Sequence, residues 1–344
     1  MNTLTKVVNR FKLASHVLRH GNMPSQNRGE IPAITFDEVE EARQFFPLDK
    51  FFIYGHARSG TTLLARLVRV HPDVHCNWQA HFFTRQPLLK GFVDDVDVEA
   101  WLTRRSNRWN RGGDLSPVVL RAISDYILER DARRVGKSVV GDKSPNSLLN
   151  GDSVRNLHAV YPDGRLLFIV RDGRDTAISH RFQNFIDAEQ HLSKDDLRIR
   201  DAFSRNPEFF YSGERSVFTK AWIRRSAERW VNNVLETDLV AKELFGDQYL
   251  AVRYEDLLTY PLMTMTEIWK HLGVDSTLPD LEKSILSEMG SNPDADWQKK
   301  KMNNVASGLQ KGRTGTWQDL FTPQDIQIYS EIAGDTLKAW GYKV

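Results

Sequence analysis

The chain has 344 residues, and 47 lysine and arginine residues against 45 aspartate and glutamate residues leave a net charge of +2. This near-neutral charge argues against a nucleic-acid-binding protein, and a content of 40% hydrophobic and 27% charged residues is typical of a folded globular chain. The single cysteine, Cys76, excludes an intramolecular disulfide and any cysteine-rich metal site, which favours a reducing, cytoplasmic location.

Residues 1–45 are predicted to form a basic amphipathic segment and a linker. Five lysine and arginine residues and no acid precede Glu30, and apolar residues from Leu4 to Leu18 recur near helical spacing. This pattern is typical of a helix that lies on a membrane surface or acts as a transit segment; the alternative is a helix packed on its own domain or a frayed terminus. We expect peripheral membrane contact at most, because basic residues interrupt any signal-peptide core and no apolar run approaches the roughly 20 residues of a membrane span.

The main domain is predicted to begin with a strand, a tight turn and a helix. The apolar run Phe51–His56 is typical of a buried strand, and it stops at the Ala-Arg-Ser-Gly sequence of residues 57–60. From Thr61 onward, leucine and valine residues at helical spacing predict a helix.

Strands and helices alternate along the rest of the chain. Strands are expected within residues 137–143, 165–175 and 248–257, and helices within 148–160, 176–185, 216–245 and 262–272. This alternation predicts an α/β fold, in which a P-loop-like parallel sheet is flanked by helices on both faces. We expect residues 46–344 to form a single domain, with an excursion or lid at residues 186–215, where charges and turn residues replace the periodic pattern.

The turn after the first strand has the composition of a phosphate-binding loop. Residues 55–62, Gly-His-Ala-Arg-Ser-Gly-Thr-Thr, follow a strand and open a helix, so their backbone N–H groups are expected to converge on an anion. Thr61 occupies the lysine position of the nucleoside-triphosphate loop G-x-x-x-x-G-K-[ST], which disfavours an ATP-dependent phosphotransferase. Arg58 supplies the cation instead, with a fork of donors suited to one phosphate. The alternative is an ordinary strand-to-helix connection.

A second anion site is predicted from Arg171 to Ser179. Arg171 ends a buried strand, and Ser179 falls about two turns into the following helix. Ligands of parallel sheets bind beyond the carboxyl ends of the strands, so both side chains are expected at this edge of the sheet. The alternative is a set of surface ion pairs among Arg171, Asp172, Arg174 and Asp175.

Five sequence strings occur in the order of one known family. The strings GHARSGTTLL, GDKSP, RLLFIVRDGRDTAIS, VRYEDL and KGRTGTW resemble the sulfotransferase family that uses 3′-phosphoadenosine 5′-phosphosulfate (PAPS), in the branch similar to carbohydrate and tyrosylprotein sulfotransferases. The resemblance covers about Phe51 to Trp317. It implies the sulfotransferase fold, PAPS as the sulfuryl donor, and a hydroxyl or amine acceptor on a small molecule, carbohydrate or peptide.

The resemblance also implies which residues hold the nucleotide. The 5′-phosphosulfate is expected at Arg58, Ser59, Gly60, Thr61 and Thr62, and the 3′-phosphate at Arg171 and Ser179. A late basic loop is expected to close over the nucleotide with Lys311, Gly312 and Arg313. Tyr254 is expected near the adenine; the alternative is a sheet residue with a satisfied hydroxyl.

Catalysis of sulfuryl transfer is expected to rest on positioned cations, because charge builds on the leaving phosphate oxygen. Arg58 and Lys143, which lies in GDKSP at a strand end, suit that role; the alternative for Lys143 is a surface lysine paired with Asp142. No metal is expected, and three residues that are close in sequence but lack a fourth ligand are interpreted as packing or surface residues: His71, His75 and Cys76.

The acceptor also needs a group that takes up its proton. In the resembling branch a glutamate about twenty residues after the loop arginine commonly does so, but Gln79 occupies that position, and an amide is not a base near neutral pH. We expect His81 to substitute; the alternatives are His180, a carboxylate from residues 186–215, or an acceptor acidic enough to need little help. The leading hypothesis is a PAPS-dependent sulfotransferase. Because of Gln79, a non-catalytic nucleotide-binding or partner-docking protein on the same scaffold stays open.

Overall fold

A parallel five-stranded sheet lies at the centre of the computed structural model, which describes Phe11, Ala14, Ser15, Leu18 and residues 31–85, 88–106, 108–148, 150–188, 190, 192–291 and 313–344. The strands are β1 (Asp49–Tyr54), β2 (Val74–Trp78), β3 (Val139–Lys143), β4 (Arg165–Val170) and β5 (Tyr249–Arg253). Their order across the sheet is β2-β3-β1-β4-β5.

Strand β1 lies in the middle of the sheet, with β3 on one side and β4 on the other. Phe51 is opposite Gly141 of β3 and Arg165 of β4, and both pairings are parallel. Strands β2 and β3 lie on one side of β1, and β4 and β5 lie on the other. Because all the strands are parallel, their carboxyl ends meet at one edge of the sheet. Because ligands of such sheets bind where the strand order reverses, the loop after β1 lies at the centre of the candidate site.

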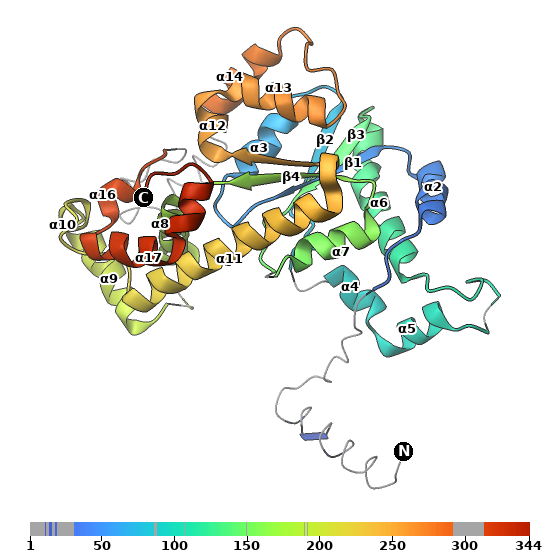
Figure 1. Cartoon of the computed structure of the whole chain (residues 1–344), viewed down its shortest axis with the longest axis horizontal. Helices are drawn as coiled ribbons and strands as arrows, with labels where there is room; N and C mark the ends of the chain where they lie inside the picture. Colours follow the sequence, from blue (N-terminus) through green and yellow to red (C-terminus); the bar gives the residue numbers. More distant parts are fainter. Residues whose placement is uncertain are drawn as a thin grey trace.

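Helices cover both faces of the sheet, which confirms the predicted α/β fold (Figure 1). One face packs against α6 (Ser116–Arg134), α7 (Asp152–Val160), α11 (Lys220–Phe245) and α17 (Pro323–Ala339). The other packs against α3 (Thr61–Val68), α12 (Tyr254–Thr259), α13 (Pro261–His271) and α14 (Leu281–Gly290). Side chains alternate along β1, so Phe52 and Tyr54 join the first core while Phe51 and Ile53 join the second.

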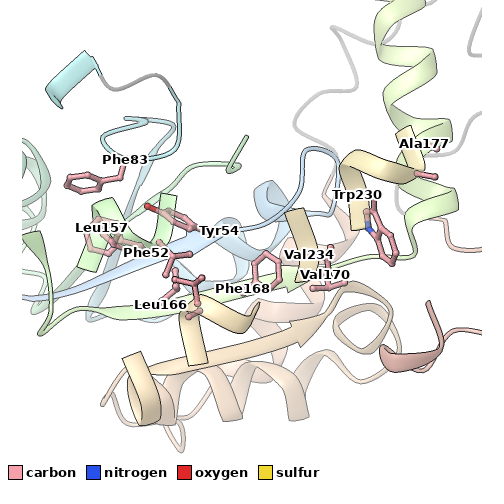
Figure 2. Packing of buried hydrophobic residues seen from close by; sticks show 14 of the residues in the cluster. Phe52, Tyr54, Phe83, Leu157, Leu166, Phe168, Val170, Ala177, Trp230 and Val234 are labelled. Atoms are coloured by element: carbon pink, nitrogen blue, oxygen red, sulfur yellow. The ribbon is translucent and has the colours of Figure 1, made fainter. Parts of the chain in front are cut away.

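The first core extends to the carboxyl edge of the sheet. Figure 2 shows Phe168 and Val170 of β4 close to Val234 of α11, with Trp230 one turn earlier on that helix. Trp230 is fully buried, and its Nε1 donates to the carbonyl oxygen of Arg171 at 3.2 Å. The core therefore fixes the backbone between β4 and α8 (Gly173–Asp187), where Arg171 lies.

Residues 186–215 are largely helical, whereas the sequence pattern predicts turns. They contain α9 (Lys194–Arg205), which begins with a capping box, and α10 (Glu208–Tyr211). Phe203 and Phe210 are buried in the first core, and Asp196 forms an ion pair with Arg181 of α8 at 2.8 Å. Tertiary contacts therefore decide the structure of this charged segment. Its role as a lid stays a prediction.

The helix α2 (Phe36–Phe45) precedes the predicted domain boundary and packs against α6; the boundary itself stays a prediction. The predicted amphipathic helix near the N-terminus lies mostly outside the described residues. Other helices among the described residues are α4 (Leu88–Val93), α5 (Val96–Thr103), α16 (Trp317–Leu320) and the short 3-10 helix η2 (Gly246–Gln248). Within the described ranges, none of the helices combines the length and the apolar character that crossing a bilayer requires.

Candidate anion-binding and catalytic site

The loop after β1 enters α3 through residues in the left-handed region. Arg58 has a φ of 74°, and Gly60, the N-cap of α3, has a φ of 94°. A Cβ on Gly60 would lie 2.2 Å from Cδ2 of Tyr254, so only glycine lets the backbone approach this ring. The first N–H groups of a helix lack intrahelical partners, and Ser59 Oγ is buried with no hydrogen-bond partner in the described structure. The loop therefore has the features of the predicted phosphate cradle.

The two predicted anion sites lie side by side. Arg58 Nε donates to Ser179 Oγ at 3.0 Å, and Arg171 Nη1 donates to the carbonyl oxygen of Arg58 at 3.3 Å. These contacts span 121 and 113 residues of sequence. Arg58, Arg171 and Ser179 therefore meet at the carboxyl edge of the sheet.

The guanidinium group of Arg171 is also held by two other parts of the chain. It stacks 4.7 Å from the ring centroid of Tyr254, the first residue of α12, and its Nη2 donates to the carbonyl oxygen of Arg313 at 2.9 Å. Tyr254 thus begins a helix after β5 and is not a sheet residue. The alternative of surface ion pairs is only half right. Arg174 pairs with Asp172 at 2.7 Å and Arg171 with Asp175 at 3.9 Å, but all four residues are buried.

Lys143 is the last residue of β3, and its side chain is 1% exposed. Its Nζ donates to Thr62 Oγ1 at 3.3 Å and lies 5.1 Å from the ring centroid of Trp78. Burial lowers the pKa of Lys143, and the nearby charge of Arg58 also lowers it. The alternative of a surface lysine is wrong, because this ammonium group is buried against the phosphate loop.

A turn with unusual backbone angles crosses the end of β3. Gln79 and His81 have φ angles of 53° and 52°. Three N–H groups hold the turn on β3: Gln79 N to the Lys143 carbonyl at 2.8 Å, Ala80 N to Asp142 Oδ1 at 3.0 Å, and His81 N to Ser144 Oγ at 2.9 Å. Ser144 Oγ in turn donates to Asp142 Oδ2. The GDKSP segment therefore supplies Lys143 and also supports the turn that carries Gln79 and His81.

The ring of His81 is neutral near pH 7. Burial, together with the charges of Arg85 and Lys143, lowers the pKa of His81 to about 4. Nδ1 lies 2.7 Å from Thr84 Oγ1, and Nε2 is buried without a hydrogen-bond partner among the described residues. With the Nδ1 proton donated to Thr84, Nε2 carries the lone pair that can accept a proton.

Two further histidines lie at the same edge. Burial lowers the pKa of His180, and the charges of Arg58 and Arg229 lower it further. His56, inside the phosphate loop, has Nδ1 2.9 Å from the carbonyl oxygen of Ala57, and burial lowers its pKa to about 4. Sequence reasoning missed His56, although its position within the loop string marks it as a candidate.

The late basic loop is described from Arg313 onward, and Lys311 and Gly312 lie outside the described residues. The carbonyl oxygen of Arg313 accepts from Arg171, and its side chain forms an ion pair with Asp319 at 3.2 Å. Arg313 therefore reaches the site through its backbone.

The interpretation of His71 and Cys76 as packing residues agrees with their surroundings. His71 is buried, with Nε2 2.9 Å from the carbonyl oxygen of Asp275 and Nδ1 accepting from Asp73 N. Burial raises the pKa of the Cys76 thiol above its ordinary value. In the part of the chain that the structure describes, no group of three or more His, Cys, Asp or Glu could hold a metal ion.

A parallel sheet with a phosphate-type loop after its central strand and arginines at its carboxyl edge defines a P-loop-like α/β protein. A family model described as the Sulfotransferase family matches residues 50–279, which is more than half of the chain. The chain belongs to the sulfotransferase family.

Two curated relatives carry the names of protein-tyrosine sulfotransferases. The Protein-tyrosine sulfotransferase of Drosophila melanogaster is 26% identical over 226 residues, which are 65% of this chain and 38% of that protein. Protein-tyrosine sulfotransferase A of Caenorhabditis elegans is 34% identical over 133 residues, 37% of this chain and 32% of that protein. The chain therefore aligns with about a third of the length of each. Among solved structures, mouse sulfotransferase SULT7A1 complexed with PAP is 19% identical with a TM-score of 0.45, covering 85% of this chain and 89% of that one.

Proposed function

We propose that this chain is a PAPS-dependent sulfotransferase, which transfers a sulfuryl group from PAPS to a hydroxyl or amine acceptor. The observation that carries the proposal is the meeting of two cationic sites: Arg58 Nε lies 3.0 Å from Ser179 Oγ, and Arg171 Nη1 lies 3.3 Å from the Arg58 carbonyl oxygen. A nucleotide with phosphate groups at both its 3′ and 5′ positions requires two such sites close together, since each phosphate needs charge-assisted donors.

The residues present fit this donor. Ser59 Oγ and Arg171 Nε are buried polar atoms with no partner in the described structure, and a buried donor left unpaired costs about 1–3 kcal/mol. Both would gain a partner from a bound anion. The ring of Tyr254 packs against Gly60 and Arg171 and would offer a flat apolar face to a base.

Bound PAPS supplies the sulfuryl group and a phosphate leaving group. Arg58 and Lys143 place two positive charges beside the start of α3, where they would stabilise negative charge that develops on the leaving oxygen. Because the side chain of Lys143 is buried, water screens its charge less than it would at the surface.

We propose His81 as the group that accepts the acceptor's proton. Its ring is neutral near pH 7, but a pKa of about 4 makes it a weak base, which suits an acidic hydroxyl such as a phenol. Two relatives are named protein-tyrosine sulfotransferases, so a peptide tyrosine is the first acceptor to test.

The experiment that tests the function is calorimetry with adenosine 3′,5′-bisphosphate, followed by transfer of labelled sulfate from PAPS to a panel of acceptors that includes tyrosine peptides. We expect binding and transfer. A folded preparation that does not bind the nucleotide would refute the proposal. Binding without transfer to any acceptor would favour the non-catalytic alternative, which rests on Gln79, and magnesium-dependent ATP binding would favour a phosphotransferase despite Thr61.

We further propose a cytoplasmic location with peripheral membrane contact through residues 1–45. The buried Cys76 is the single cysteine of the chain and has no disulfide partner within it, which is typical of proteins from reducing compartments. Fractionation of cells that express the full chain tests the location, and recovery only from an oxidising compartment would contradict it.

A further inference from the structure

A buried carboxylate holds the chain that follows Arg313. Asp175, in the first turn of α8, is 1% exposed. Its Oδ2 accepts from Gly315 N at 2.7 Å and its Oδ1 accepts from Trp317 N at 3.1 Å. Hydrogen bonds to an ionised acceptor are roughly twice as strong as neutral ones, so this single side chain ties residues 313–317 firmly to α8.

Two arginines close to Asp175 contact the same segment. Arg171 Nη2 donates to the carbonyl oxygen of Arg313 at 2.9 Å, and the guanidinium carbon of Arg174 lies 3.7 Å from the ring centroid of Trp317. The segment therefore contacts a cationic side chain at each end, and the carboxylate of Asp175 accepts hydrogen bonds from its middle and last residues.

The position of Arg171 depends on this segment. Its guanidinium group spans from the Arg313 carbonyl to the Arg58 carbonyl, which it reaches at 3.3 Å. Asp175 Oδ2 also lies 3.9 Å from Arg171 Nη2. If residues 313–317 moved away from α8, Arg171 would lose one of the two carbonyl groups that orient it toward the phosphate loop.

We propose that Asp175 is a positioning residue for nucleotide binding, because it anchors residues 313–317 and through them holds Arg171 against the phosphate loop. This inference rests on the proposed function. Electrostatics alone predicts the opposite effect: a carboxylate this close to Arg171 offsets its charge and repels a phosphate, so removing the carboxylate would strengthen binding. The sign of the change in affinity therefore separates anchoring from simple charge repulsion.

The test uses the full chain with Asp175→Asn, which keeps the size of the side chain but turns one acceptor oxygen into an NH2 donor. Hydrogen exchange at the amides of Gly315 and Trp317, measured without nucleotide, reports the anchor, and calorimetry with adenosine 3′,5′-bisphosphate reports affinity. We expect exchange about tenfold faster or more and a Kd about tenfold higher or more, because two charge-assisted hydrogen bonds are weakened. We expect kcat at saturating PAPS to stay within about threefold.

Two other variants guard against a folding defect. Asp125→Asn alters another fully buried carboxylate, one that accepts from the Tyr161 hydroxyl at 2.8 Å near the start of β1, and it is expected to change neither readout. Gly315→Ala strains the segment itself, because Gly315 has a φ of +77°, and it is expected to raise the Kd in the same direction as Asp175→Asn.

The outcomes distinguish this inference from the proposed function. If the wild-type chain binds the nucleotide and Asp175→Asn binds it equally or more tightly, the anchoring role is overturned and the proposed function stands. Unchanged amide exchange at Gly315 and Trp317 also overturns it. If the wild-type chain does not bind adenosine 3′,5′-bisphosphate, the proposed function fails. The role of Asp175 in nucleotide binding then fails as well, whatever the amide exchange shows.

Discussion

Replacing Lys143 by methionine removes the ammonium group but keeps much of the side chain's length. In the structure this group lies 3.3 Å from Thr62 Oγ1 and 5.1 Å from the centroid of the Trp78 ring, and the side chain is 1% exposed. Loss of one positioned donor to developing charge typically lowers kcat by about 10²–10³, which is roughly 2.7–4 kcal/mol. We expect Lys143→Met to lower kcat by that factor and to change the Kd of adenosine 3′,5′-bisphosphate by less than about threefold, since the interaction strengthens in the transition state.

Initial rates at saturating PAPS give kcat, and calorimetry gives the Kd. A matched control is Lys50→Met, because Lys50, the second residue of β1, is also a buried lysine but pairs with Glu129 at 2.6 Å, at the end of β1 opposite the phosphate loop. This control should lower the melting temperature and leave the Kd unchanged. The lowered pKa of Lys143 adds a second readout, since the rate should fall as pH rises through a value below the 10.5 of an ordinary lysine.

Equal losses in kcat and in nucleotide affinity for Lys143→Met would refute this reasoning, because they would show that the lysine binds the ground state as well as the transition state. A loss in kcat below about tenfold would also refute it. In either case the ammonium group would be a structural contact of the phosphate loop.

Three further predictions concern the other parts of the site. Arg171→Ala should weaken binding of adenosine 3′,5′-bisphosphate by about 2 kcal/mol or more, roughly 30-fold in Kd by calorimetry, and an unchanged Kd would assign Arg171 a purely structural role. If His81 is the base, it must be unprotonated, so kcat should fall as the pH drops below its pKa of about 4. This fall should be absent in His81→Gln, and a fall of the wild-type kcat near pH 6.5 would exclude His81 as the base. Burial raises the pKa of Asp142 from 3.8 to about 6. The folded chain therefore binds the proton of this carboxyl more tightly than the unfolded chain does, so the free energy of unfolding falls as the pH rises from about 4 to 6. Asp142→Asn should remove roughly 2–3 kcal/mol of that fall in denaturant titrations, and parallel wild-type and variant curves would contradict the assignment.

Four of the five strands could be predicted from the sequence because each contains a short apolar run, as in the Arg165–Val170 strand β4. The pattern does not predict β2, Val74–Trp78, because His75 and Asn77 alternate with its buried residues Val74 and Cys76 and leave no continuous apolar run. The order of the strands could not be predicted either, since the number of residues between strands does not determine which of them pair.

The helix α9 shows where local sequence fails. Its residues are mostly charged, and its place is set by contacts with distant parts of the chain, through Phe203 in the core and the ion pair between Asp196 and Arg181. A periodicity argument sees only neighbours within the helix, so it reads such a segment as irregular.

The candidate site could also be predicted only in part from the sequence. Arg58 and Arg171 follow strands and have recognisable local motifs, so their place at one edge of the sheet could be predicted. Their supports could not. Asp142 and Asp175 act by accepting backbone N–H groups from segments far away in sequence, and no local pattern distinguishes such a carboxylate from a surface one.

The close approach of Gly60 to Tyr254 links the two halves of the site. The missing Cβ lets the tyrosine ring lie directly against the loop, and the guanidinium group of Arg171 also contacts that ring, 4.7 Å from its centroid. One added methyl group on this glycine would displace the ring, so a change at the first anion site would also disturb the aromatic contact of Arg171 at the second. Engineers who wish to retune donor preference must therefore vary the glycine, the aromatic residue and the arginine as one unit.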